Sequence, residues 1–184
     1  YPDQSEGRPS EEGDGDAEVT GSSHLIDNVR KLQKAKEGGL KNEVMDLNDI
    51  LAGQQAQYSK VPDKDVTINF TPGPPCTVMA NGLIKDVFSN LVWNAIKHSD
   101  GTSVEINMGI KRQQEDGMAF YNVVIEDNGP GIPDTQKEQI FARFQRGNTK
   151  ASGKGLGLYL VKTLVEDLHG LVWVENSVPE DYSR

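Results

Sequence analysis

The sequence predicts an α/β protein: a two-layer sandwich whose mixed sheet carries its helices on one face, preceded by an amphipathic helix. Two segments, 81–98 and 155–168, repeat apolar residues at helical spacing. In three other stretches, 66–70, 104–110 and 121–125, apolar residues alternate with polar ones, which is the period of a half-buried strand. Because helices and strands interleave along the chain, we expect the helices to pack against one sheet.

The N-terminal part predicts a flexible segment followed by a helix. Gly, Pro, Ser and acidic residues dominate the first 16 positions, which lack apolar periodicity. Leu25, Val29 and Leu32 then recur on one helical face. That face needs a partner helix, from this chain or another. The expected regions are 1–16, a flexible acidic segment; 17–37, the helix; 38–45, a linker that starts with two glycines; and 46–184, the main domain.

The main domain is expected to open with a short strand at 46–48 and a helix over 48–59. Asp46 and Asn48 are both suitable N-cap residues for this helix, because their side-chain oxygens can accept from backbone N–H groups. A strand, a Pro-rich turn and a second short strand are expected next, at 66–70, 71–75 and 76–79.

The second half of the domain contains the strongest helix candidate, residues 81–98, in which seven apolar residues cover one broad face. Two alternating strands follow, and the polar stretch 112–117 between them predicts a hairpin loop. Residues 155–168 predict another apolar-faced helix, and residues 171–174 a final strand.

The charge of the chain is unevenly distributed. Its 184 residues include 19 basic and 28 acidic side chains, a formal net charge of −9. Residues 1–20 hold seven acids and one base, which leaves 18 bases and 21 acids in residues 21–184, a net charge of −3. No broad basic patch is expected, which argues against nucleic acid as a partner, since binding that polyanion requires neutralising its phosphates. No apolar run approaches the roughly 20 residues that cross a bilayer.

The single cysteine, Cys76, excludes an internal disulfide framework and a cysteine-rich zinc site. It suits a small strand or turn residue better than a nucleophile. A reducing, cytoplasmic setting is expected. The sequence begins at Tyr1 rather than Met, which suggests a fragment of a longer protein.

A first polar cluster lies on the helix over 81–98. Asn90 and Asn94 are four residues apart, so their amides project on the same side. Amide oxygens are hard neutral ligands that suit Mg²⁺. Lys97, followed by His98, offers a positive charge to a phosphate. An ordinary polar helix edge explains the same residues, and this pattern alone does not decide between the two.

A second cluster, residues 126–133, directly follows an alternating strand. Gly129 and Gly131 permit backbone conformations closed to other residues and allow a ligand to approach closely. Asp127, at the strand end, can accept a hydrogen bond from an exocyclic amine such as that of adenine. The alternative is a plain Asn-Gly or Pro-Gly turn.

A third cluster, residues 153–158, opens the helix over 155–168. Glycines at a helix N-terminus expose backbone N–H groups toward an anion, and the helix dipole adds to the attraction. Lys154 could supply a further positive charge. The run matches neither the dinucleotide-binding fingerprint nor the phosphate-binding P-loop.

The polar stretch between the second and third clusters predicts a mobile lid. Phe141 and Phe144 would anchor it, and Arg143, Arg146 and Lys150 would be available to phosphate.

In their order and spacing, these clusters resemble the nucleotide-binding domain of sensor histidine kinases, in the superfamily that includes gyrase, heat-shock chaperone and mismatch-repair ATPases. Residues 90–98 look like the asparagine box, 127–132 like the first glycine box, 141–144 like the phenylalanine box and 153–158 like the second glycine box. The resemblance covers about residues 46–176. It implies a Bergerat ATP-binding fold with the nucleotide under a flexible lid.

The resemblance also implies a role for each matching position. Asp127 would hydrogen-bond the adenine amino group, and Asn94, assisted by Asn90, would coordinate Mg²⁺. Lys97 and His98 would lie near the phosphates or the ribose. The catalytic positions would be Asn90, Lys97 and Arg143, and the remaining ATP contacts would be Gly129, Gly131, Ile132, Phe144, Gly153, Lys154, Gly155, Leu156 and Gly157.

The helix over 17–37 resembles the second helix of the kinases' dimerisation hairpin, which builds a four-helix bundle across a homodimer. The first hairpin helix should carry a phosphoacceptor His followed by an acid and a base, and this sequence contains no such motif. His24 does not match it, because Leu25 and Ile26 follow. The sequence also stops at Arg184, before the family's usual last strand. Both departures suggest a piece of a longer kinase.

Asn90 separates the kinase branch from the ATPase branch. Gyrase-type ATPases place a Glu there as the general base for water, and an amide cannot accept that proton. The resemblance therefore implies transfer of the ATP γ-phosphate to a hairpin histidine and onward to an aspartate of a response regulator. Two alternatives stay open: a regulatory module that binds nucleotide without transferring phosphate, and a slow ATPase.

Overall fold

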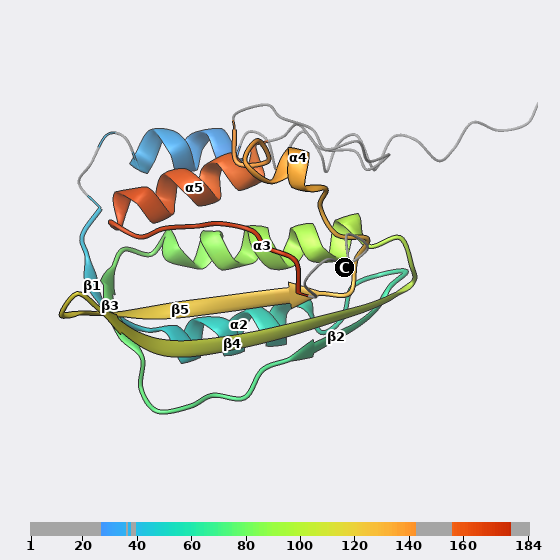
Figure 1. Cartoon of the computed structure of the whole chain (residues 1–184), viewed down its shortest axis with the longest axis horizontal. Helices are drawn as coiled ribbons and strands as arrows, with labels where there is room; N and C mark the ends of the chain where they lie inside the picture. The colour runs from blue at the N-terminus through green and yellow to red at the C-terminus, as the bar shows by residue number, and fades with distance from the viewer. Residues whose placement is uncertain (1–26, 36, 38–39, 143–155, 178–184) are drawn as a thin grey trace, which may run out of the picture.

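The computed structural model describes residues 27–35, 37, 40–142 and 156–177. Residues 27–35 are helical and are called the N-terminal helix. Figure 1 shows the sheet along one side of the molecule with helices stacked above it. The other elements are β1 (Glu43–Asp46), α2 (Leu47–Tyr58), β2 (Asp65–Asn69), β3 (Thr77–Ala80), α3 (Ile84–His98), β4 (Ser103–Glu115), β5 (Met118–Asp127), α4 (Asp134–Lys137) and α5 (Gly157–Asp167).

The main sheet is mixed, as predicted. Its strands lie in the order β2-β4-β5, with β2 parallel and β5 antiparallel to β4. The register sets Ile68 opposite Ile106, and Ile106 opposite Asp127. β1 and β3 form a separate antiparallel pair at one end of the molecule (Figure 1).

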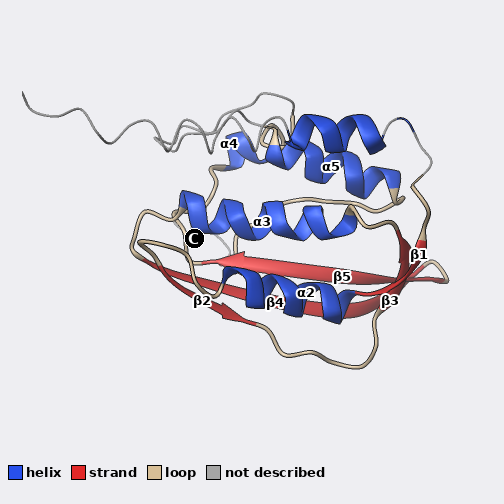
Figure 2. Cartoon of the chain, turned by 180° about the vertical axis from the view of Figure 1, so that it is seen from behind, coloured by secondary structure: helices blue, strands red, loops and turns tan. Residues whose placement is uncertain are grey.

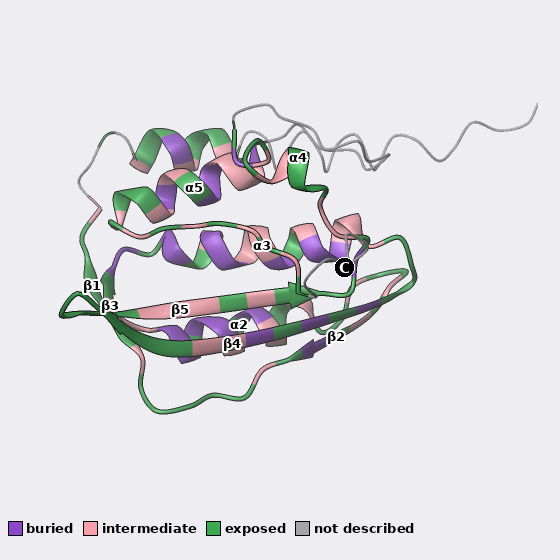
Figure 3. Ribbon diagram, viewed as in Figure 1, coloured by how far each residue is buried: buried purple, intermediate pink, exposed green. Residues whose placement is uncertain are grey.

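Helices cover one face of this sheet, which confirms the predicted sandwich. Along β4, Val104, Ile106 and Met108 are buried and the residues between them are exposed, because successive side chains point to opposite faces. α2 and α3 lie over the buried face and add Leu51 and Val92, both fully buried, to the core. Figure 2 shows the two helices against the strands, and Figure 3 shows the buried stretches that face each other.

α5 packs on the side of α3 that faces away from the sheet. Leu160 on α5, Val87 on α3 and Leu32 on the N-terminal helix belong to one apolar cluster, and Figures 1 and 2 show the N-terminal helix beside α5. The apolar face of the N-terminal helix therefore finds partners within its own chain, although Val29 stays 40% exposed. The predicted flexible segment 1–16 lies outside the described residues, and so do His24, Leu25 and Ile26.

Asp46, rather than Asn48, is the N-cap of α2, which begins at Leu47. The Asp46 Oδ1 atom accepts from the backbone N–H of Asn48 at 2.9 Å and from that of Cys76 at 3.1 Å. The hydrogen bond from the Asn48 backbone is the main reason why the pKa of Asp46 lies below its usual value. The cap also ties α2 to the residue that precedes β3, so Cys76 has a structural place.

The two long helices lie close to their predicted ranges. α3 begins at Ile84 instead of residue 81 because Asn81 forms a turn first: its side-chain Oδ1 accepts from Leu83 N at 3.0 Å, and its backbone O accepts from Ile84 N at 3.1 Å. None of the helices in the described part of the chain is both long enough and apolar enough to span a membrane.

The hairpin loop predicted at 112–117 is wrong. β4 continues through Glu115, which pairs with Met118 of β5, so Asp116 and Gly117 alone form the turn. Their φ angles are +50° and +79°, as in the type I′ turn that Asp-Gly sequences favour. The polarity of residues 112–115 reflects an exposed extension of the hairpin.

The final strand predicted at 171–174 is also wrong, because the structure assigns no strand to these residues. Exposure does alternate there: Leu171 is 85% and Trp173 56% exposed, whereas Val172 packs against the cluster formed by α3 and α5. Within the described residues, β5 is hydrogen-bonded to β4 alone. Alternating exposure of side chains is not enough to form a strand, because without a partner strand the backbone lacks the ladder of hydrogen bonds that defines one.

Candidate functional site

Asp127 lies at the end of β5, on the helix-covered side of the sheet. It is directly opposite Ile106, and directly opposed residues of an antiparallel pair share a face. Ile106 is fully buried beneath the helices, whereas Asp127 is exposed. Asp127 therefore stands where the covered face of the sheet meets solvent.

The two glycines after Asp127 occupy positions where a side chain would clash or would strain the backbone. Gly129 N donates to Asp127 Oδ1 at 2.9 Å, and a Cβ at Gly129 would approach that oxygen to 2.6 Å. Gly131 has a φ of +74°, which glycine adopts at little cost. Asn128 fixes the bend to β4, since its backbone N donates to Glu105 O at 3.1 Å and its Oδ1 accepts from Glu105 N at 2.9 Å. The second cluster is thus a defined turn that also presents a carboxylate.

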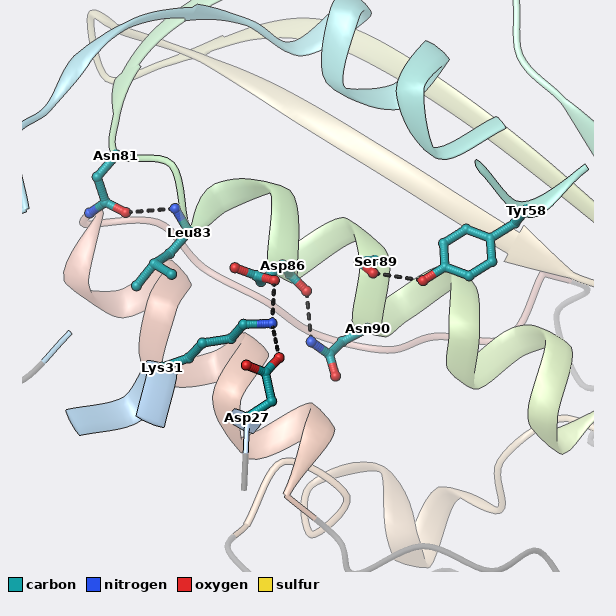
Figure 4. Close-up of polar contacts among 8 residues, drawn as sticks. All are labelled: Asp27, Lys31, Tyr58, Asn81, Leu83, Asp86, Ser89 and Asn90. Atoms are coloured by element: carbon teal, nitrogen blue, oxygen red, sulfur yellow. Dashed lines mark hydrogen bonds and ion pairs between the residues drawn. The ribbon is translucent and has the colours of Figure 1, made fainter. Parts of the chain in front are cut away.

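Asn90 and Asn94 lie one turn apart on α3, and both are half-buried. The Asn90 Nδ2 atom donates to the backbone O of Asp86 at 2.8 Å (Figure 4). This hydrogen bond fixes the orientation of the amide and leaves its Oδ1 on the side of α5: a Cβ at Gly157 would lie 3.0 Å from Asn90 Oδ1 and 3.9 Å from Asn94 Nδ2. Gly157, the first residue of α5, therefore lies next to the side chains of both asparagines.

The C-terminal end of α3 is positively charged and partly desolvated. Burial lowers the pKa of His98 below its ordinary 6.5; the charges of Lys97 and Lys64 lower it further, and the charge of Asp127 opposes them. Burial also lowers the pKa of Lys97. α3 and β5 are in contact in the fold, which agrees with the effect of the Asp127 charge on His98.

The described site residues form one strip along α3. Asn90 and His98 are separated by eight residue steps, which correspond to about 12 Å along the helix axis. Gly157 adjoins the strip at the Asn90 end, and Asp127 interacts with it at the His98 end. Three sequence clusters that are far apart in the chain thus come together here.

The structure describes only some of the other predicted site residues. Ile132 is half-buried between Gly131 and α4, and Leu156 is buried next to Gly157. Phe141, one of the two predicted lid anchors, is also buried. Arg143, Phe144, Arg146, Lys150, Gly153, Lys154 and Gly155 lie outside the described residues.

Sequence reasoning missed residues that support the strip from other elements. Lys64 donates to backbone oxygens at the end of α3. Asp86 holds Asn90 through its backbone oxygen, and the Tyr58 hydroxyl lies 2.7 Å from Ser89 Oγ (Figure 4). The spacing of four between Asp86 and Asn90 was the one available signal, because Lys64 and Tyr58 are more than 30 residues from the groups they contact.

The described residues contain no cluster of three or more His, Cys, Asp or Glu side chains that could hold a metal ion. An open depression elsewhere, beside α2 and the end of β2, contains none of the predicted site residues. It is lined by Gln55, Asn69, Phe70, Thr71, Asn107 and Met108.

Comparison with protein families adds independent information. The family described as "Histidine kinase-, DNA gyrase B-, and HSP90-like ATPase" matches residues 80–183, more than half of the chain. The matched range contains α3, β5 and α5, the three elements that carry the strip and its two ends.

Several curated sensor kinases are similar in sequence. The sensor-type histidine kinase PrrB of Mycobacterium tuberculosis is 33% identical over 138 residues, which are 72% of this chain and 29% of PrrB. The sensor protein KdpD of Escherichia coli is 32% identical over 158 residues, 83% of this chain and 17% of KdpD. The chain thus spans less than a third of the length of these relatives.

Solved structures of kinase domains have the same fold. The catalytic domain of the histidine kinase ThkA matches 76% of this chain and 90% of its own, with a TM-score of 0.63 and 27% identity. The mycobacterial sensor histidine kinase MprB matches 77% of this chain and 90% of its own, with a TM-score of 0.60 and 26% identity. The chain therefore belongs to the histidine kinase-, DNA gyrase B- and HSP90-like ATPase family, and within it is homologous to the ATP-binding catalytic domains of two-component sensor histidine kinases.

Proposed function

We propose that the chain is the ATP-binding catalytic part of a sensor histidine kinase, which transfers the γ-phosphate of ATP to a histidine of the parent protein's dimerisation hairpin. The observation that carries the proposal is the strip along α3, with Gly157 against Asn90 and Asn94 at one end and Asp127 interacting with His98 at the other. A nucleotide is elongated in the same way, with its base at one end and its phosphates at the other.

The base of ATP is proposed to bind at the Asp127 end. The Asp127 carboxylate would accept a hydrogen bond from the exocyclic amino group of adenine, while its contact with Gly129 N holds it in place. Gly131 and Ile132 would line the same end. His98, whose lowered pKa keeps it neutral near pH 7, would hydrogen-bond the ribose or a phosphate without adding charge, and Lys97 would supply a positive charge.

The phosphates are proposed to lie at the Gly157 end together with Mg²⁺. The missing Cβ of Gly157 leaves space beside Asn90 Oδ1, and amide oxygens suit an ion that keeps several waters and shares phosphate oxygens. The residues present therefore fit Mg²⁺, which Asn94 would hold with help from Asn90. When bound, the ion would neutralise charge on the transferred phosphate. Backbone N–H groups at the start of α5 would face the same phosphates, with Gly153, Lys154, Gly155 and Leu156 beside them.

Transfer to a side chain is favoured over hydrolysis because of Asn90. Its amide cannot take a proton from water, so the chain has no general base at that position. An imidazole nitrogen of the hairpin would attack the γ-phosphorus in line, forming an N–P bond as the bond to the leaving ADP oxygen breaks. Arg143 and the lid aromatic Phe144 are proposed to close over the reacting phosphate, where the positive charge of Arg143 offsets the developing negative charge.

The proposed setting is a cytoplasmic homodimer that passes its phosphoryl group to an aspartate of a response regulator. The N-terminal helix supports the dimeric part of this proposal, because it resembles the second helix of the hairpin and leaves Val29 40% exposed for a further partner. The division into helix, linker and catalytic domain near residues 37 and 46 remains a prediction.

An ATP-binding measurement on Asp127→Asn tests the proposed pocket. We expect the affinity for Mg²⁺-ATP to fall about tenfold or more, because the amide exchanges one acceptor for a donor that faces the adenine amino group. Isothermal titration calorimetry on the whole chain would measure it. Asp116→Asn, in the exposed hairpin turn where Asn also tolerates positive φ, is the matched control and should bind as the unmodified chain does.

Equal ATP affinity in Asp127→Asn and the unmodified chain would reject the pocket. If both variants behave as expected but no phosphate reaches a supplied acceptor histidine, the chain is a nucleotide-binding regulatory module. If phosphate is instead released steadily into water and the release stops in Asn94→Ala, the chain is a slow ATPase.

A further inference from the structure

Lys64 connects the start of β2 to the end of α3. Its Nζ atom donates to the backbone O of Ile96 at 2.5 Å and to the backbone O of Ser99 at 3.1 Å. The last carbonyl groups of a helix have no partner within the helix, and they carry the negative end of the helix dipole. A single half-buried ammonium group therefore satisfies two carbonyls and complements the dipole at the point where α3 stops.

The backbone of Lys64 is itself fixed on both sides. Lys64 forms an isolated bridge with Val61, in a turn where Asp63 has a φ of +61°. The next residue, Asp65, donates from its backbone N to Thr102 O at 2.7 Å and opens the parallel pairing of β2 with β4. The backbone that carries the ammonium group is thus anchored to the sheet. The hydrogen bonds of this group therefore fix the end of α3 relative to the sheet.

The same end of α3 carries two of the residues proposed to bind the nucleotide. Lys97 and His98 lie between the two carbonyl groups that Lys64 holds, in the sequence order Ile96 to Ser99. The sheet also positions Asp127, which pairs with Ile106 of β4. The contacts of Lys64 therefore bridge the two sides of the Asp127 end of the strip, the helix side and the sheet side.

We propose that Lys64 is a positioning residue for the nucleotide, which fixes the last turn of α3 so that Lys97 and His98 stay at the correct distance from Asp127. This inference rests on the proposed function. It requires no contact between Lys64 and ATP, because Lys64 acts through the backbone of α3.

The charge of Lys64 supports the same role. Burial is the main cause of the lowered pKa of His98, and the positive charges of Lys97 and Lys64 add to it against the opposing charge of Asp127. Lys64 thus favours the neutral form of His98 as well as holding the backbone on both sides of it, at Ile96 and Ser99. A lysine whose sole effect was on global stability would leave the properties of His98 in the folded state unchanged.

Three variants of the whole chain test the proposal: Lys64→Met, which keeps the apolar stem and removes the ammonium group; Lys64→Arg, which keeps the charge and the donors; and Lys60→Met, an exposed lysine four residues away. For Lys64→Met we expect Mg²⁺-ATP affinity to fall about tenfold and the His98 pKa, followed by NMR, to rise toward its ordinary value. Lys64→Arg should recover most of the affinity, and Lys60→Met should change neither quantity.

The proposal is overturned if folded Lys64→Met binds ATP as the unmodified chain does, or if the His98 titration is unchanged. If Lys64→Met does not fold, Lys64→Gln, which retains an N–H donor without the charge, is judged by the same two measurements. The outcomes also separate this inference from the proposed function. An unmodified chain that binds no ATP rejects the proposed function, and the His98 titration then still decides whether Lys64 controls the end of α3.

Discussion

A single hydrogen atom at Gly157 allows the first turn of α5 to lie against the asparagines of α3. A Cβ there would come within 3.0 Å of Asn90 Oδ1, and the Asn90 amide cannot turn away without losing its hydrogen bond to Asp86 O. We therefore predict that Gly157→Ala lowers Mg²⁺-ATP affinity several-fold, even though alanine favours helix formation. Calorimetric titration with ATP and Mg²⁺ would measure the change.

Gly53→Ala is the matched control for that variant. Gly53 lies inside α2, and a Cβ there would meet nothing within 4 Å. This change should stabilise the fold by about 0.5–1 kcal/mol through helix propensity and leave ATP affinity unchanged. Unchanged ATP binding in Gly157→Ala would mean that α5 does not adjoin the phosphates.

His98 links the stability of the fold to pH. Its pKa is below 6.5 in the folded chain, chiefly because of burial, so the unfolded chain binds the proton more readily. As the pH falls below about 6.5, the free energy of unfolding should decrease through His98 until the folded-state pKa is passed. Urea unfolding at pH 7.5 and pH 5.5 should show a smaller loss of stability for His98→Gln than for the unmodified chain. An equal loss in both would contradict the burial of a neutral imidazole.

Among the elements, the N-terminal helix is joined to α3 by an ion pair as well as by Leu32. Lys31 Nζ lies 2.8 Å from Asp86 Oδ1 and 2.5 Å from Asp27 Oδ2 (Figure 4). Burial lowers the pKa of Lys31, but its hydrogen bonds with both carboxylates more than offset this and raise it above 10.5. Because the Lys31 and Asp86 side chains are about a quarter exposed, we predict a coupling free energy of about 1 kcal/mol.

A double-mutant cycle of Lys31→Met and Asp86→Asn, followed by chemical denaturation, would measure this coupling. The pair Lys162–Glu166, 3.8 Å apart on the exposed side of α5, is the control and should give about 0.3 kcal/mol. Strictly additive effects at Lys31 and Asp86 would show that the N-terminal helix is held by apolar contacts alone.

The elements also show what kind of pattern predicts structure. Alternation along β4 and β5 was sufficient to predict both strands, because buried and exposed faces impose a period of two. The same signal failed at residues 171–174, where the described part of the sheet supplies no partner strand. The loop prediction at 112–117 was wrong because the polar residues 112–115 belong to the exposed end of β4, and Asp116-Gly117 alone forms the turn.

At the scale of the whole molecule, the motifs predicted which residues meet but not what holds them. Asp127, His98, Asn90 and Gly157 come from three separate clusters, and the fold brings them to one strip along α3. Lys64 could not be found in this way, because its contact with α3 spans 32 residues and depends on a sheet register that no local pattern encodes. Residues that act through tertiary hydrogen bonds become visible only in the folded chain.

The central claim is phosphotransfer to a histidine, and one experiment tests it directly. The chain is mixed with Mg²⁺, γ-labelled ATP and a dimer of the full-length parent kinase whose own pockets carry Asp127→Asn, so that the dimer offers acceptor histidines while its own pockets bind ATP more weakly than the chain does. We predict acid-labile label on the full-length partner and none on the chain alone. Bound ATP with no label on the partner, or label released only as inorganic phosphate, would contradict the proposed kinase function.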